Sequence, residues 1–296
     1  MINFENVSKY ALNNVSIHIP KGEIVGLIGA SGAGKTTMIK LACGLLAPDS
    51  GRVYTLDMDP VINRKLYKNN VSTFITGVPL LCRDDTVLQG FELIRSVYGI
   101  GKTEFDKRYE ELSERLDFGR YENQSVKNLS LGQRMRAELG AALIYESKLL
   151  LLDEPNVGLD ENGKVALYEL LTECCKNGMT VLMTSHDMSG VSKMCGRIAL
   201  LDSGKLVFYG SGENLRSRYA PIDVMTIKFG GNIPDLEDLP LKKYSVMGDT
   251  LTLSYNSNHI TSAEILKLIL GQTSVSEVSI RKPSLESIIS LLKKGE

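Results

Sequence analysis

The sequence contains no tryptophan, three histidines and five cysteines among its 296 residues. The cysteines are odd in number, Cys174 and Cys175 are adjacent, and none has the spacing of a metal-binding cluster. This pattern argues against a disulfide framework, because such frameworks use even numbers of separated cysteines. It favours a reducing compartment such as the cytoplasm.

Long apolar runs and an excess of charge of one sign are also missing. No run approaches the roughly 18 apolar residues of a membrane span, and the segment 1–5 lacks the basic patch and apolar core of a signal peptide. The 34 lysines and arginines nearly balance 35 aspartates and glutamates, for a net charge of −1. No global field therefore attracts nucleic acid or an anionic membrane. Any action at a membrane is expected to depend on partners.

The order of apolar segments predicts an α/β fold. Continuous apolar runs at 24–28, 149–152 and 180–184 are typical of buried parallel strands. Helical patterns at 37–42 and 165–177 alternate with them. Strands that alternate with helices imply a parallel sheet with helices packed on it.

The pattern changes in the last quarter of the chain. Two stretches of alternating apolar residues predict half-exposed strands there. Thr261 and Glu264 form a capping-box pattern ahead of a helix, and Pro283 opens a further helix. We therefore predict one domain over residues 1–221 and a small α+β accessory domain over residues 222–296.

A glycine-rich segment follows the first buried strand and precedes a helical pattern. It comprises Gly29, Ala30, Ser31, Gly32, Ala33, Gly34, Lys35, Thr36 and Thr37. The order of residues matches the phosphate-binding pattern G-x-x-x-x-G-K-[ST], whose N–H groups form an anion nest at a helix N-terminus. Lys35 would reach the outer phosphates and the Thr36 hydroxyl would bind Mg²⁺. The plainer alternative is a glycine-rich turn between two core elements.

Two acidic residues end the second apolar run. Asp153 and Glu154 directly follow the run 149–152, so they lie at the carboxyl edge of the sheet, where the phosphate loop also lies. Asp153 is placed to organise the shell of Mg²⁺, and Glu154 could polarise an attacking water. The alternative is a strand that ends in two solvated acids.

Three further motifs carry a family resemblance. The segment Ser130, Leu131, Gly132 and Gln133 resembles the signature of ATP-binding cassette (ABC) proteins, usually Leu-Ser-Gly-Gly-Gln, with Leu131 replacing the first glycine. In isolation it would be an ordinary helix N-cap at Ser130. Asp160 lies in a stretch that resembles the D-loop of that family, and His186 resembles its switch histidine. Order and spacing agree over about residues 1–215.

The resemblance implies a P-loop NTPase cassette with a mixed central sheet, an antiparallel β subdomain and a helical subdomain at about 85–145. Two cassettes would face each other head to tail. Ser130 and Gly132 of one would then meet the γ-phosphate of ATP held by the other. Glu154 and His186 would be catalytic. Tyr10 stands where the family often stacks an aromatic ring on adenine; the alternative is a tyrosine in an edge strand or turn.

One position departs from the family pattern. Many members carry a glutamine ahead of the helical subdomain, which reaches Mg²⁺ or water and touches the membrane partner, and Gly77 stands there in this sequence. Glycine has no side chain for either task, so Thr76 or water would have to substitute. We hypothesise weakened positioning of Mg²⁺ or water, with ATP binding retained.

The resemblance implies an ATP-hydrolysing subunit that powers export of a drug, antibiotic, peptide or lipid. Its cofactors would be ATP and Mg²⁺, and its partners a separate transmembrane permease and a second copy of the cassette. It would lie at the cytoplasmic face of the cell membrane, and the accessory domain would steady the dimer, regulate it or merely pack. One rival is a soluble ABC ATPase on nucleic acid or ribosomes, which the lack of a basic patch with interleaved aromatics disfavours. The other is a slow or non-hydrolysing regulatory cassette, which the presence of Glu154 and His186 disfavours.

Overall fold

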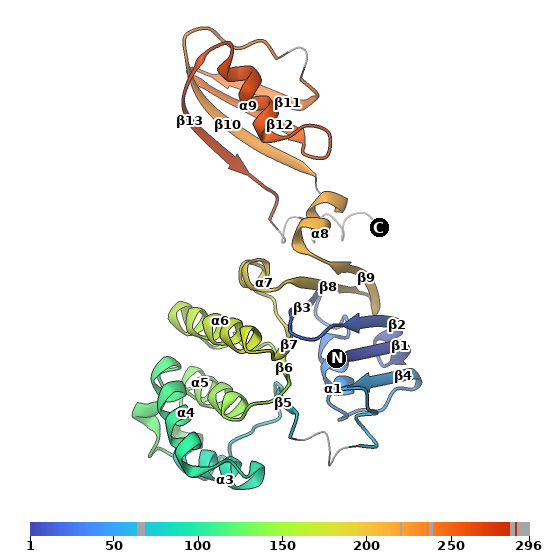
Figure 1. The fold of residues 1–296 in the computed structure, drawn as a ribbon, viewed down its shortest axis with the longest axis vertical. Coiled ribbons are helices and arrows are strands. Elements are labelled where there is room, and N and C mark those ends of the chain that lie inside the picture. The colour runs from blue at the N-terminus through green and yellow to red at the C-terminus, as the bar shows by residue number, and fades with distance from the viewer. Residues whose placement is uncertain (64–68, 220, 237–238, 285–287, 289–296) are drawn as a thin grey trace. The chain divides into compact units, whose positions relative to one another are not determined.

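The chain divides into two compact units, Met1–Gly210 and Ser211–Glu296, in this computed structural model. Residues 1–63, 69–219, 221–236, 239–284 and 288 are described by the structure (Figure 1). The division falls ahead of the predicted boundary at residue 221, because helix α8 (Gly212–Tyr219) groups with the second unit. The helix expected after Pro283 lies outside the described residues.

A six-stranded mixed sheet forms the centre of the first unit, with the order β5-β6-β7-β3-β8-β9. Its strands are β3 (Ile24–Gly29), β5 (Val71–Phe74), β6 (Leu149–Asp153), β7 (Thr180–Thr184), β8 (Arg197–Asp202) and β9 (Lys205–Gly210). All neighbours are parallel except β8 and β9. β3, β6 and β7 are buried along their whole length, which explains their continuous apolar runs. Their carboxyl ends meet at one edge of the sheet.

Alternate residues of the central strands face two separate cores. Val25, Leu27 and Leu182 pack with helix α1 (Lys35–Ala42) and with an antiparallel sheet of order β2-β1-β4. That sheet is formed by β1 (Ile2–Lys9), β2 (Leu12–Ile19) and β4 (Ser50–Thr55). In Figure 1, α1 and this sheet lie on one side of the central strands and α3 to α6 on the other. The expected mixed sheet and antiparallel β subdomain are confirmed.

The second core joins the other face of the sheet to the helices. These are α3 (Val87–Tyr98), α4 (Lys102–Arg115), α5 (Leu131–Leu143), α6 (Glu161–Lys176) and α7 (Met188–Met194). Short 3-10 turns at Gly119–Tyr121 and Val126–Asn128 precede α5. Phe91 and Phe118 stack with ring centroids 5.1 Å apart inside the helical region. Helices α3, α4 and α5 of that region lie between Val87 and Leu143, and the limits of about 85–145 for a helical subdomain stay a prediction.

The second unit is an antiparallel sheet with one helix. Its strands β10 (Ile222–Gly230), β11 (Leu241–Met247), β12 (Thr250–Asn256) and β13 (Ser274–Arg281) have the order β11-β12-β10-β13. Helix α9 (Ser262–Leu270) begins after Thr261, whose hydroxyl accepts a hydrogen bond from the N–H of Glu264 at 3.3 Å. The predicted capping box is therefore confirmed. Met225, Leu253 and Ile265 belong to a core of this unit's own.

Candidate nucleotide-binding and hydrolysis site

The phosphate loop joins β3 to α1 in a conformation that requires glycine. Gly34 has a φ of +102°, in the left-handed region that side chains disfavour. A β-carbon at Gly34 would lie 2.4 Å from Leu12 Cδ2, and one at Gly29 would lie 2.3 Å from the carbonyl oxygen of Leu201. The two ends of the motif are therefore glycine because neighbouring atoms leave no room, and the loop stays close to the sheet edge.

Lys35 is held inside this loop. Its side chain is only 7% exposed, and Nζ donates hydrogen bonds of 3.0 Å to the carbonyl oxygens of both Gly29 and Ala30. An ammonium group held by neutral carbonyls gains from exchanging them for phosphate oxygens, since charge-assisted hydrogen bonds are the stronger ones. The geometry therefore suits Lys35 to a polyphosphate.

Asp153 and Thr36 meet at the carboxyl edge of the sheet. The Thr36 hydroxyl lies 3.1 and 3.0 Å from the two oxygens of Asp153, and the Thr184 hydroxyl donates to Oδ1 at 2.8 Å. Asp153 is 2% exposed. Hydroxyl and carboxylate oxygens are the ligands that Mg²⁺ prefers, and at phosphate sites this ion takes only one or two carboxylates. The described residues hold no cluster of three or more His, Cys, Asp and Glu side chains that suits a metal. Thr36 and Asp153 therefore fit Mg²⁺ bound together with a phosphate.

Glu154 presents an oxygen without a hydrogen-bond donor at the same edge. Its φ of +54° is rare for a residue with a side chain, and such strain clusters at functional sites. Oε2 accepts a hydrogen bond of 3.2 Å from the backbone N–H of His186. Nε2 of His186 lies 3.2 Å from Oε1, but within the described residues the buried Oε1 has no partner of hydrogen-bond geometry.

Burial raises the pKa of the Glu154 carboxyl, and the nearby charges of His186 and Lys35 oppose that rise. A carboxylate with a raised pKa and an oxygen that lacks a hydrogen-bond donor is a better proton acceptor at neutral pH than an ordinary glutamate. Glu154 can therefore accept a proton from a water, and His186 lies where it can orient that carboxylate.

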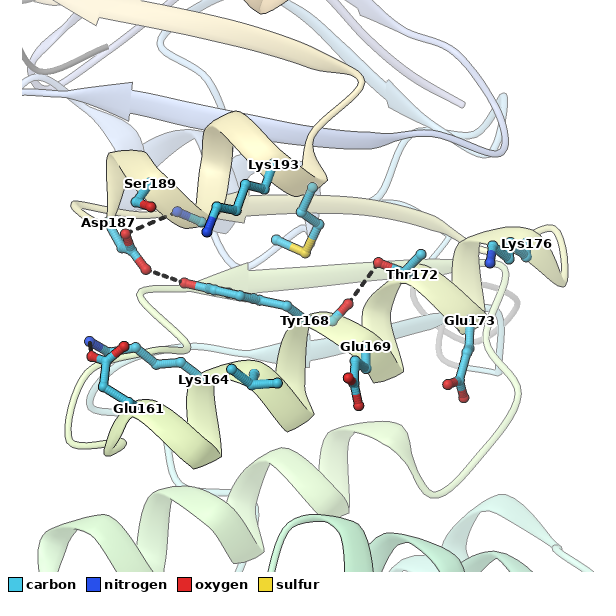
Figure 2. Close-up of a pocket in the computed structure, with 13 residues that line it drawn as sticks. Glu161, Lys164, Tyr168, Glu169, Thr172, Glu173, Lys176, Asp187, Ser189 and Lys193 are labelled. Atoms are coloured by element: carbon cyan, nitrogen blue, oxygen red, sulfur yellow. Dashed lines mark hydrogen bonds and ion pairs between the residues drawn. The ribbon is translucent and has the colours of Figure 1, made fainter. Parts of the chain in front are cut away.

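The segment around His186 is anchored on two sides. The Ser185 hydroxyl donates to Asn156 Oδ1 at 3.4 Å and accepts from the N–H of Asp187 at 2.9 Å. Tyr168 of α6 donates its phenol proton to Asp187 Oδ2 at 2.6 Å, across a pocket between α6 and α7 (Figure 2). These contacts hold the residues on both sides of His186.

Sequence reasoning missed Thr184, Ser185, Asp187 and Tyr168. Thr184 ends the strand predicted at 180–184 and Ser185 follows it, directly ahead of His186, so their place beside the site could have been inferred from their position next to that histidine. Tyr168 gave no signal, because a tyrosine in a helical pattern is most often a core residue. Its partner lies on another element, and only the packing of α6 against α7 brings them together.

The signature residues start α5. The Ser130 hydroxyl accepts from the N–H of Gln133 at 3.3 Å, and the Gln133 side chain accepts from the N–H of Ser130 at 2.8 Å. Leu131 between them is half exposed. A β-carbon on Gly132 would lie 2.8 Å from the carbonyl oxygen of Gly158. The signature thus packs directly on the segment that follows Glu154.

Asp160 connects this cluster to α6. Its carboxylate accepts from the N–H of Gly163 at 2.9 Å and caps the helix, and it forms an ion pair with Arg136 of α5. α6 therefore begins at Glu161, and the expected start at Val165 was wrong. The first turn is polar, so the apolar pattern did not include it.

Two further positions were singled out by the sequence. Tyr10 lies in the turn between β1 and β2 with a φ of +49°, and it is 74% exposed with Lys9 Nζ 5.0 Å from its ring centre. Gly77 follows β5 with a φ of +82° and open space around it. The neighbouring Thr76 donates its hydroxyl proton to the carbonyl of Asp153 at 3.0 Å. The role of Tyr10 in stacking and that of Thr76 as a substitute stay predictions.

The loop, its buried lysine and the acids at the end of β6 define the class of protein, a P-loop nucleotide hydrolase of the cassette type. Comparison with known families agrees: the model described as "ABC transporter" matches residues 12–157. The ABC transporter ATP-binding protein NatA of Bacillus subtilis is 31% identical over 69% of this chain and 83% of its own. The chain belongs to the family of ABC transporter ATP-binding proteins. It is an ATP-binding ATPase.

Other relatives differ in how much of the chain they match. The daunorubicin resistance ATP-binding protein DrrA3 of Streptomyces coeruleorubidus is 28% identical over 95% of this chain and 90% of its own. The methionine import ATP-binding protein MetN of Geobacillus kaustophilus is 37% identical over 69% of this chain and 61% of its own. The solved dimeric cassette MJ0796 with ADP and Pi has 27% identity and a TM-score of 0.64, over 71% of this chain and 98% of its own. The cassette fold is therefore shared.

Proposed function

We propose that this chain is the ATPase subunit of an exporter for a drug, antibiotic, peptide or lipid. The observation that carries the proposal is the extent of the matches. The drug-resistance relative matches 95% of the chain, which includes most of the accessory unit, whereas the methionine import relative matches 69%. An accessory unit similar to that of a resistance protein favours export over import.

Each residue of the site has a task in this proposal. The loop from Gly29 to Thr37 and the Lys35 ammonium bind the phosphates of ATP. Thr36 and Asp153 hold Mg²⁺, which supplies neutralisation of phosphate charge when bound. Glu154 accepts the proton of the attacking water, and His186 keeps the Glu154 carboxylate in place beside the γ-phosphate. The exposed ring of Tyr10 stacks on adenine.

A second copy of the cassette completes the site. Ser130 and Gly132 lie at the N-terminus of α5, and such a terminus attracts phosphate through its N–H groups and its dipole. The half-exposed Leu131 lies on the same surface. In the proposed dimer, these residues contact the γ-phosphate of ATP bound by the partner. The dimeric structure of the related cassette MJ0796 with ADP and Pi supports the pairing of two cassettes.

A separate permease is the third element of the proposal. In the described part of the chain, every helix is too short or too polar to cross a membrane. Val78, Leu93 and Val97 are exposed apolar residues of the segment after β5 and of α3. Exposed apolar residues favour a protein contact, and we assign that face to a cytoplasmic helix of the permease. The chain would then lie at the cytoplasmic face of the cell membrane.

Affinity isolation of the tagged chain from solubilised membranes tests the partner, with identification of the bound proteins. The expected result is an integral membrane protein in stoichiometric amount. Inside-out vesicles that contain the complex should then accumulate a fluorescent apolar drug only when ATP is present, and vesicles with Glu154→Gln should not. Isolation of ribosomes or nucleic acid in place of a membrane protein would contradict the proposal.

A slow or regulatory cassette is the second candidate, and Gly77 is the observation that favours it. The ATPase rate of the wild type against that of Glu154→Gln decides between the two. A wild type that hydrolyses ATP no faster than the variant would support the regulatory candidate.

A further inference from the structure

Glu138 is a buried carboxylate that the hydrolysis site does not use. It lies on α5, about two turns after Ser130, and is 3% exposed. Among the described residues of the first unit, the other buried charged side chains are Lys35 and Asp153, which both belong to the phosphate site. A buried charge is costly unless it is paired or hydrogen-bonded, so the contacts of Glu138 require an explanation.

The partners of Glu138 are backbone groups of the segment after β5. Oε2 accepts a hydrogen bond from the N–H of Leu80 at 2.7 Å, and the N–H of Leu81 lies 3.4 Å from Oε1. Burial raises the pKa of this carboxyl, and the two N–H groups and Arg134 oppose the rise. The carboxylate therefore clamps two consecutive amides of a segment that has no regular secondary structure.

The other end of this segment is tied to the phosphate site. The Thr76 hydroxyl donates to the carbonyl oxygen of Asp153 at 3.0 Å. Between the two attachments, the N–H of Val78 donates to the carbonyl of Ile75 at 2.9 Å and closes a tight turn. The segment 76–81 thus connects the strand end that carries Asp153 with the middle of α5.

The helix α5 carries that connection to the signature. Ser130 caps the same continuous helix, about two turns from Glu138, so a displacement at Glu138 is expected to displace Ser130 as well. Because Gly77 has no side chain, no side chain at that position can transmit a displacement from the phosphate site to α5. The Thr76 hydroxyl, the backbone of segment 76–81 and the Glu138 carboxylate offer a connection that needs no side chain at position 77.

We propose that Glu138 is a positioning residue that couples segment 76–81 to the signature helix, so that ATP at one phosphate loop sets the placement of Ser130. The proposal rests on the proposed function in one respect, which is closure of two cassettes over ATP. Glu138 itself touches neither nucleotide nor metal. It acts by fixing the N-terminus of α5 relative to the strand end at Asp153.

The test compares Glu138→Gln with a control that weakens the same helix elsewhere. Ser72 of β5 donates its buried hydroxyl proton to the carbonyl of Ala142 in α5, so Ser72→Ala removes a buried bond to α5 but leaves the amides of Leu80 and Leu81 untouched. Both changes are made in the Glu154→Gln background, which retains ATP. Binding of a fluorescent ATP analogue to the monomer and ATP-dependent dimerisation in the ultracentrifuge are measured for each variant.

We expect Glu138→Gln to leave binding to the monomer within about twofold and to weaken ATP-dependent dimerisation at least about tenfold, the factor for a lost charged hydrogen bond. Ser72→Ala should lower the melting temperature and leave dimerisation unchanged. Equal effects of both variants on dimerisation would overturn the coupling role. If the Glu154→Gln protein itself does not dimerise with ATP, the proposed dimer is wrong as well. This result differs from failure of the coupling role alone, in which the Glu154→Gln protein dimerises and both added changes affect dimerisation equally.

Hydrogen exchange keeps the inference testable if Glu138→Gln does not fold. Amide protection is then followed in the Glu154→Gln protein with and without ATP. We expect the amides of Leu80 and Leu81 to change protection together with those at the start of α5. A change confined to α5 would overturn the proposal.

Discussion

The phenol oxygen of Tyr168 lies 2.6 Å from Asp187 Oδ2, so a residue of α6 holds the neighbour of His186 in place. Asp187 also accepts from the N–H of Gly190 at 3.0 Å, which caps α7. The tyrosine packs so closely that a β-carbon on Gly190 would lie 2.4 Å from its hydroxyl oxygen. The chain around His186 is therefore fixed by the packing of α6 against α7.

Tyr168→Phe should lower kcat of ATP hydrolysis about tenfold and leave KM nearly unchanged, because a lost hydrogen bond to a charged group costs about 1.5–3 kcal/mol and acts only on the placement of His186. Steady-state kinetics measure both constants. Tyr145→Phe is the matched control, since that hydroxyl bonds the carbonyl of Val71 at 2.6 Å. Equal losses in both variants would show that general stability, and not His186, explains the effect.

Glu154→Gln should reduce ATP hydrolysis by about 10²- to 10⁴-fold, the usual contribution of a general base, because an amide does not accept the proton of the attacking water. ATP binding should persist, since Lys35 and the loop are unchanged. A phosphate-release assay and equilibrium binding measure the two properties. Glu169→Gln, at an exposed position of α6, serves as the control and should keep full activity.

The rate should also depend on pH through Glu154. Its pKa is raised by burial, and only the ionised form accepts a proton. Activity is therefore retained above that raised pKa and lost as the pH falls through it, at a higher pH than for an exposed glutamate. His186→Ala removes a charge that lowers this pKa, so the acid limb of the kcat profile should shift to higher pH. A limb that does not shift would argue against the contact between the two side chains.

Gly77→Gln tests the position at which the family glutamine is missing. The φ of +82° imposes strain of about 1–2 kcal/mol on any residue with a side chain, so Gly77→Ala is the necessary control. If the missing side chain limits the rate, the glutamine variant should hydrolyse ATP faster than the alanine variant. The measurement is the ATPase rate of Gly77→Gln against that of Gly77→Ala, compared once their melting temperatures are shown to match. Equal rates would contradict weakened positioning of Mg²⁺ or water.

Local sequence determined the parts of this protein that depend on short-range chemistry. Gly29 and Gly34 stand at the fixed positions of a short phosphate-binding pattern, so the loop was visible in the sequence, although the atoms that crowd them belong to Leu201 and Leu12. Asp153 and Glu154 followed from a buried strand that ends in acids. The capping box at Thr261 followed from side chains three residues apart, and the N-cap at Ser130 followed from its hydroxyl side chain ahead of a helix. These features need no knowledge of distant packing.

Tertiary structure alone decided the contacts between elements far apart in the chain. Nothing near Glu138 or Tyr168 in sequence indicated that one would clamp the amides of Leu80 and Leu81 and the other would bond Asp187. The boundary between the units was likewise set by where α8 packs. Such contacts depend on how helices and strands are placed in three dimensions, and a local pattern carries no information on a partner that lies on another element.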